Sequence, residues 1–183
     1  MLTEGQRVEL LGIARVAIAN RSPHGTVVFE STPISWPNAG AFVTLRKQGE
    51  LRGCIGHVEP DRPLDVTVAR VAVAAAQTDP RFPSVSRDEL DAISIEISVL
   101  GPLERIFGLH DVAIGRHGLV VERALHRGLL LPQVAVEHAW SADVFASQTC
   151  VKAGLPPDAW QRGATLWRFE AEVFGESDAD EAA

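Results

Sequence analysis

The sequence lacks the marks of a membrane or secreted protein. Its longest apolar run, Val66 to Ala76, is interrupted by Thr67 and Arg70 and is far too short to cross a bilayer. The segment Met1 to Arg7 has neither the positive start nor the apolar stretch of a secretory signal. We therefore expect a protein of the cytoplasm with no membrane association.

Cysteine is scarce. Cys54 and Cys150 lie far apart, and neither belongs to a Cys-x-x-Cys or His-x-x-His pair. The 6 histidines are scattered, and no two have a helical spacing that would bring ligands together. We predict two thiols in a reducing compartment, no disulfide framework and no metal site.

Basic runs are also absent. The formal net charge is −7, and acidic residues accumulate from Glu176 to Glu181. This balance disfavours nucleic-acid binding driven by phosphate contacts. It leaves one alternative open, a basic cleft assembled from dispersed arginines such as Arg46, Arg52, Arg81 and Arg116.

Apolar residues are plentiful, at 46% of 183 residues, which is enough to bury a hydrophobic core without the help of disulfides or bound metals. We predict one domain over residues 1–176 and a disordered acidic tail over 177–183, whose composition cannot bury enough surface to order itself. Glycine spacing in Leu51 to Gly56 fits neither the Rossmann nor the Walker A pattern. No cofactor is therefore expected.

Apolar periodicity and capping residues, among them a capping box of Thr3 and Gln6, predict helices over 4–20, 64–77 and 141–153. Strict alternation makes Ile93 to Val99 the clearest strand, and Gln48-Gly49 is typical of a hairpin turn. Further strands are predicted over 41–47, 51–58, 112–114, 119–122, 129–131 and 167–173. This order lacks regular βαβ alternation, so we predict an α+β fold with mostly antiparallel sheets and about three helices.

The stretch from Ser22 to Gly40 is rich in proline and glycine, with one possible short pairing segment at Val27 to Phe29. Long irregular loops in compact domains are often functional. We therefore predict that this loop borders a pocket.

Cys54 is the leading candidate for a nucleophile. In a regular strand Arg52 and Cys54 share one face, while Gly53 and Gly56 remove side-chain bulk around them. A nearby guanidinium favours the thiolate, and bare backbone lets a substrate approach the sulfur. His57 points to the opposite face and is a poor base. The structural alternative is a packed cysteine between glycines that serve packing alone.

Four polar residues are further candidates for ligand binding. Asp79 and Arg81 lie in the stiff segment Asp-Pro-Arg-Phe-Pro and can present opposite charges to a polar ligand, or form an internal ion pair while Phe82 enters the core. Gln133 and Lys152 can make directional polar contacts, although solvent exposure explains a lone lysine equally well.

Six strings, in this order, resemble the AMMECR-type domain, the family called AmmeMemoRadiSam system protein A in prokaryotes. The resemblance extends from about Thr3 to Glu176. Its most specific part is Leu-Arg-Gly-Cys-Ile-Gly at 51–56. The strings are Phe42 to Leu45, Leu51 to Gly56, Asp79 to Pro83, Ile97 to Leu100, Leu129 to Val134 and Lys152 to Trp160.

The resemblance implies an α+β domain with a larger and a smaller lobe and a cleft between them near the Cys54 hairpin. It also implies two partners, a Memo-like protein related to extradiol dioxygenases and a radical SAM protein. It does not define a reaction. The family's motif residues fall here on Arg52, Gly53, Cys54, Gly56, Asp79, Arg81, Gln133 and Lys152.

Three functions are therefore compared. The first is an enzyme component with Cys54 as nucleophile or covalent anchor, Arg52 and Arg81 binding an anionic group of a small molecule or protein, and the partners doing any redox chemistry. The second is a non-catalytic adaptor or ligand-binding domain that delivers a ligand to those partners. The third is RNA binding or modification, which the acidic composition disfavours.

Overall fold

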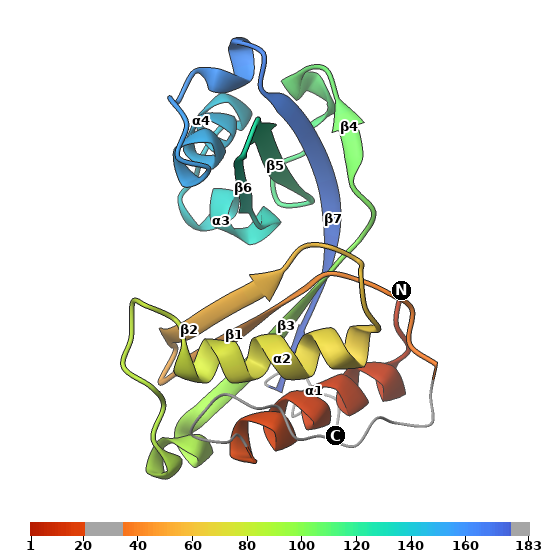
Figure 1. Cartoon of the computed structure of the whole chain (residues 1–183), viewed down its shortest axis with the longest axis vertical. Coiled ribbons are helices and arrows are strands. Elements are labelled where there is room, and N and C mark those ends of the chain that lie inside the picture. The colour runs from red at the N-terminus through yellow and green to blue at the C-terminus, as the bar shows by residue number, and fades with distance from the viewer. Residues whose placement is uncertain (21–34, 177–183) are drawn as a thin grey trace. The chain divides into compact units, whose positions relative to one another are not determined.

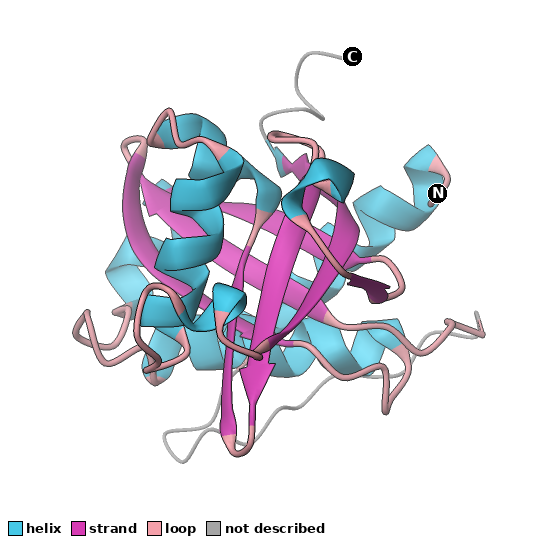
Figure 2. Ribbon diagram, turned by 90° about the horizontal axis from the view of Figure 1, so that it is seen from above, coloured by secondary structure: helices cyan, strands magenta, loops and turns pink. Residues whose placement is uncertain are grey.

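The computed structural model describes residues 1–20 and 35–176. The predicted segment Val27 to Phe29, most of the loop that contains it and the predicted tail 177–183 lie outside the described residues. The chain divides into two compact units, one made of Met1–Leu100 with Glu172–Ala183 and the other of Gly101–Ala171. Each unit contains both helices and strands, which Figure 2 shows in cyan and magenta.

The first unit is an antiparallel sheet covered by two helices. Its strands β1 (Ala41–Lys47), β2 (Glu50–His57) and β3 (Ile93–Leu100) lie in the order β2-β1-β3. Helices α1 (Glu4–Ala19) and α2 (Leu64–Gln77) run side by side across one face of these strands (Figure 1). The short 3₁₀ helix η1 (Arg87–Ala92) leads into β3.

Strand alternation explains the core of this unit. Val43 and Leu45 of β1 pair with Ile97 and Ile95 of β3, and all four side chains are buried. Because side chains two residues apart share a face of a strand, these residues make one continuous apolar layer. The alanines and valines of α2 pack onto it.

The predicted capping box at the start of α1 is confirmed. The main-chain N–H of Gln6 donates to Thr3 Oγ1 at 3.3 Å, and the N–H of Thr3 donates to Gln6 Oε1 at 2.9 Å. These bonds satisfy donors that the first turn of a helix leaves without partners. The same device, formed by Ser86 and Glu89, begins η1.

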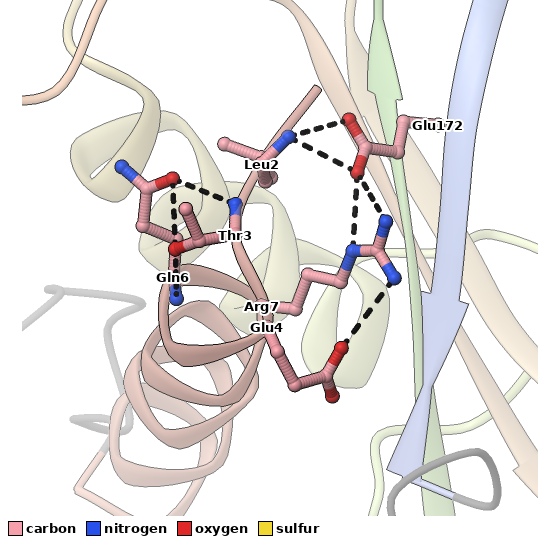
Figure 3. Close-up of polar contacts among 6 residues, drawn as sticks. All are labelled: Leu2, Thr3, Glu4, Gln6, Arg7 and Glu172. Carbon is pink, nitrogen blue, oxygen red and sulfur yellow. Dashed lines mark hydrogen bonds and ion pairs between the residues drawn. The ribbon is translucent and has the colours of Figure 1, made fainter.

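The longest strand, β7 (Thr165–Gly175), enters the first unit at Glu172. Its carboxylate accepts hydrogen bonds from the main-chain N–H of Leu2, at 3.0 and 3.2 Å, and from the guanidinium of Arg7, at 2.9 and 3.1 Å (Figure 3). Glu4 forms a longer ion pair with the same arginine at 3.5 Å. The residues that begin α1 are thereby joined to β7.

Glu176 is joined to the same unit. Its carboxylate pairs with the guanidinium of Arg15 and accepts the main-chain N–H of Ile95 at 2.8 Å. Arg15 also donates to the carbonyl oxygens of Leu90 and Ile93, each at 2.7 Å. Glu176 is therefore bonded to the first unit, although the charge pattern of the sequence grouped it with the acidic residues that follow.

The second unit is also an antiparallel sheet with helices. Strands β4 (Glu104–Ile106), β5 (His117–Arg123) and β6 (His126–Leu130) join the first part of β7 in the order β4-β7-β5-β6. Helix α4 (Ala142–Lys152) packs on β5 and β6, and the short helix α3 (Pro132–Glu137) packs on β5. Two 3₁₀ turns, η2 (Leu109–Asp111) and η3 (Ala159–Gln161), complete this unit.

The fold class is α+β, as predicted, and the three predicted helices are present. Helix α3 was not predicted, and it begins at Pro132, a residue well suited to the first helical position. The predicted strand at 112–114 is wrong, because the N–H of Val112 closes a tight turn on Leu109 and that of Ala113 donates to His117 Nδ1. Across the described ranges, no helix reaches the length and apolarity needed to cross a membrane.

Candidate functional site

Cys54 lies on β2, the outer strand of the three in the first unit. The hairpin that leads into it turns at Gln48 and Gly49, both with positive φ of 54° and 83°, as the sequence predicted. An outer strand leaves every second N–H and C=O without a partner strand. At Cys54 those groups are satisfied by side chains.

Asp79 and Arg81 supply these partners. Asp79 Oδ2 accepts the N–H of Cys54 at 2.8 Å, and Arg81 Nη2 donates to its carbonyl oxygen at 3.2 Å. One carboxylate and one guanidinium therefore take the place of a neighbouring strand at this residue. They also hold the main chain of Cys54 in a defined position.

The two side chains are joined to each other as well. Asp79 Oδ1 accepts from Arg81 Nε at 2.9 Å and from the main-chain N–H of Arg81 at 3.1 Å, and Oδ2 accepts from Nη2 at 2.7 Å. The Asp79 side chain is 2% exposed and that of Arg81 is 51% exposed. The hydrogen bonds from Arg81, followed by that from Cys54, hold the pKa of Asp79 well below its usual range.

The internal ion pair considered for this segment is thus present. Phe82, which that interpretation placed in the core, is only half-buried, so this part of the prediction is wrong. Its ring lies 5.5 Å from Arg81 Cζ, where a cation–π contact forms. The core position next to this segment is taken by Val85.

The sulfur of Cys54 faces Thr44 of β1. These two residues are register partners, and Thr44 Oγ1 donates to Cys54 Sγ at 3.4 Å. Because the main-chain groups of Cys54 point away from β1, this is a pair in which the side chains approach closely. The pKa of Arg81 is raised, first by its hydrogen bonds to the Asp79 carboxylate and to a smaller extent by the charge of the Cys54 thiolate. Arg81 is therefore the cation beside this half-buried thiol.

Arg52 occupies a different position from the one that alternation predicted. Leu45 pairs with Gly53 and Arg46 pairs with Leu51, so Arg52 is the extra residue of a β-bulge. Alternation does not hold across a bulge, and the prediction that Arg52 and Cys54 share a regular face is wrong. No strand partner faces Arg52, and its guanidinium turns to other residues.

Glu89 and Pro83 receive the guanidinium of Arg52. Its Nε and Nη2 donate to the carboxylate of Glu89 at 3.2 and 3.1 Å, and its Nη1 donates to the carbonyl oxygen of Pro83 at 2.8 Å. Lys47 reaches the same carboxylate at 3.0 Å. The pKa of Glu89 is held well below its usual range, chiefly by Arg52, then by the Ser86 N–H and Lys47.

Gly53 and Gly56 serve close packing. A Cβ on Gly53 would lie 2.3 Å from the carbonyl oxygen of Ala75 in α2, and one on Gly56 would lie 2.2 Å from the ring of Phe42. The first glycine lets helix and strand approach each other, and the second leaves room for an aromatic ring. Both contacts match the structural alternative for the glycines, and Phe42 fills the space above Gly56.

The remaining candidates lie elsewhere. Gln133 is half-buried on α3 and Lys152 is exposed at the end of α4, both in the second unit. His57 bonds to Asp61 at 2.8 Å. Cys150 is fully buried, and burial raises the pKa of its thiol. In the described residues, no three His, Cys, Asp or Glu side chains gather as metal ligands would.

These features define an α+β protein with a cysteine on an outer strand that is held by an aspartate–arginine pair. The AMMECR1 family profile matches residues 11–174, and the chain belongs to the AMMECR1 family. A protein of Methanosarcina mazei is 42% identical over 191 residues, covering 98% of this chain and 96% of its own. Protein MJ0810 of Methanocaldococcus jannaschii is 43% identical, covering 89% and 86%.

A solved structure supports the same assignment. The uncharacterized protein PH0010 from Pyrococcus horikoshii is 40% identical to this chain and superposes with a TM-score of 0.85. The match covers 92% of this chain and 90% of that one. The similarity therefore extends over nearly the whole fold.

Proposed function

We propose that this protein is a cytoplasmic enzyme component in which Cys54 is a nucleophile or covalent anchor for a small-molecule or protein substrate. One observation carries the proposal: Thr44 Oγ1 donates to the sulfur of the half-buried Cys54, and the guanidinium of Arg81, which Asp79 fixes, donates to the carbonyl oxygen of the same residue. A cation and a hydrogen-bond donor at a sulfur both favour the thiolate over the thiol. The thiolate is the form that attacks electrophiles.

The chemical step assigned to the protein is simple. The thiol proton leaves to solvent, the sulfur forms a bond to an electrophilic carbon, and the electron pair displaced from that carbon moves to an oxygen or to a leaving group. The rigid main chain around Cys54 keeps the sulfur in place for this attack. Any redox chemistry belongs to the partners.

The proposed partners are a Memo-like protein and a radical SAM protein. They are implied by the resemblance of motifs such as Leu51 to Gly56 and Asp79 to Pro83 to the AmmeMemoRadiSam family. In this scheme, the chain holds a substrate covalently while a partner transforms it. The cleft near the Cys54 hairpin, also implied by the resemblance, stays a prediction.

The test compares two cysteine variants. The chain is purified from cells that also express its genomic neighbours and is examined by native mass spectrometry for bound ligands and partners. Cys54→Ser should lose a covalent adduct and the cellular function, whereas Cys150→Ala should keep both, because Cys150 is buried far from solvent. Unchanged cellular function in the Cys54→Ser strain would reject the enzyme proposal.

The second candidate is a non-catalytic adaptor. It is favoured by the internal use of Arg52 and Asp79 and by glycines that only allow packing. An adaptor should tolerate Cys54→Ala but lose partner binding on charge reversal, as in Arg81→Glu. RNA binding is the third candidate function. A gel-shift series over salt concentration tests it by measuring whether the chain binds RNA with a salt-dependent affinity.

A further inference from the structure

The guanidinium of Arg81 has N–H donors, at Nη1, that a ligand can use. An arginine carries five N–H bonds in one plane. Here Nε and one Nη2 hydrogen bind the Asp79 carboxylate, and the other Nη2 hydrogen binds the carbonyl oxygen of Cys54. Within residues 1–20 and 35–176, no acceptor receives a hydrogen bond from Nη1 of Arg81, and the side chain is 51% exposed.

These donors are held rigidly. The side-on pair of bonds to Asp79 sets the plane of the guanidinium, and the Asp79 carboxylate is itself 2% exposed and fixed by the Cys54 N–H. The ring of Phe82 lies 5.5 Å from Arg81 Cζ and restricts the same group further. Donors that are already oriented cost little to order when a ligand arrives.

The direction of the donors is toward the cysteine. In a planar guanidinium, Nη1 and the Nη2 hydrogen that reaches the Cys54 carbonyl are on the same end. An oxyanion that accepts from Nη1 at this end is therefore next to Cys54. This geometry places the ligand group beside the main-chain carbonyl of Cys54, in the residue that carries the reacting sulfur.

The local charge has the sign that such a ligand needs. Arg52 binds the carbonyl oxygen of Pro83, which brings the Lys47–Glu89–Arg52 group beside the segment that carries Arg81. Together these contacts gather three cations (Lys47, Arg52 and Arg81) and two carboxylates (Asp79 and Glu89), in a chain whose formal charge is −7.

We infer that Nη1 of Arg81 binds an oxyanion, the carboxylate or phosphate group of a substrate whose electrophilic carbon reacts at Cys54. The inference rests on the proposed role of Cys54 and adds the class of substrate. Arg52 has no part in this binding, because its guanidinium is already engaged by Glu89 and Pro83.

Two alkylating reagents of different charge test the inference. Iodoacetamide is neutral and iodoacetate carries a carboxylate, and both transfer their carbon to sulfur as iodide leaves. The rates at Cys54 are measured by peptide mass spectrometry at neutral pH in the folded wild-type chain, in Arg81→Gln and in Arg70→Gln. Arg70 is an exposed residue of α2, so its variant makes the same change of charge without touching the cysteine.

We expect the ratio of the iodoacetate rate to the iodoacetamide rate to fall about tenfold in Arg81→Gln, the size of one charge-assisted hydrogen bond, and to stay unchanged in Arg70→Gln. Inorganic phosphate should slow the iodoacetate reaction of the wild type but not that of Arg81→Gln. Because each ratio is taken within one variant, a small loss of stability affects both reagents alike.

The outcomes separate the two proposals. Equal ratios in wild type and Arg81→Gln, with Cys54 reactive in both, overturn the oxyanion site and leave the nucleophile intact. A folded wild type in which neither reagent labels Cys54 overturns both. Arg81→Lys keeps the charge without the planar fork, and an unchanged ratio there would assign the effect to charge alone and overturn the role of Nη1.

Discussion

The main-chain N–H of Cys54 donates to the carboxylate of Asp79, 25 residues further along the chain, at 2.8 Å. The bond joins the outer strand β2 to the turn that follows helix α2. The same carboxylate orients Arg81 beside the cysteine. The position of the thiol and the position of its cation therefore depend on one buried side chain.

Replacing that side chain should be costly. Asp79→Asn keeps the shape but removes the charge that Arg81 pairs with, and losing a charge-assisted hydrogen bond of a buried carboxylate typically costs about 2 kcal/mol of the free energy of unfolding. Urea denaturation followed by circular dichroism measures this loss. Asp91→Asn, at an exposed residue of η1, is the control and should have a midpoint close to that of the wild type.

Stability should also fall in acid. The pKa values of Asp79 and Glu89 are lower in the folded chain than their usual values, so the unfolded chain takes up protons first as pH falls. Their contribution is fully present above about pH 5 and is lost progressively below about pH 4. Denaturation curves between neutral and acid pH should show a weaker dependence in Asp79→Asn and in Glu89→Gln. Parallel profiles for wild type and Asp79→Asn would refute this.

The two cysteines should differ in reactivity by at least about tenfold at neutral pH. Cys54 is half-buried beside a cation, whereas Cys150 is fully buried and its pKa is raised by burial. Limiting iodoacetamide followed by peptide mass spectrometry compares the two in the folded protein. Earlier labelling of Cys150, or labelling of Cys54 only after denaturation, would favour the adaptor.

Alanine at two glycines should have opposite effects. Gly53→Ala places a Cβ 2.3 Å from the main-chain oxygen of Ala75, and such overpacking should cost about 2 kcal/mol. Gly12→Ala lies on α1 with nothing within 4 Å, and it should stabilise the chain by about 0.5 kcal/mol. Thermal unfolding measures both. Equal melting temperatures for the two variants would contradict the packing role of Gly53.

The end of the chain offers a matched pair of changes. Deleting residues 177–183 should leave the melting temperature nearly unchanged, because that acidic composition cannot bury much surface. Glu176→Ala in the full chain should lower it, because the variant loses the partner of Arg15 and of the Ile95 N–H. If the truncation lowered the melting temperature as much as Glu176→Ala, the boundary at 176 would be wrong.

Local patterns in the sequence were enough for much of the fold. The Thr3 and Gln6 capping box, the turn at Gln48-Gly49 and the alternation of Ile93 to Val99 each depend on residues within a few positions of one another. Such patterns act before distant parts of the chain meet, so they can be recognised in the sequence. They predicted the α+β class and three helices. The motif at 51–56 likewise indicated the family.

The surroundings of Cys54 depended on the tertiary structure. A regular two-residue hairpin would place Thr44 opposite Gly53, but the bulge at Arg52 shifts the register by one and brings Thr44 to the sulfur. The bulge also turns Arg52 to Glu89, and Arg81 becomes the neighbouring cation. These contacts join residues that are distant in sequence. Their geometry comes from the packing of α2 and the following turn against β2, which no periodicity within one segment encodes.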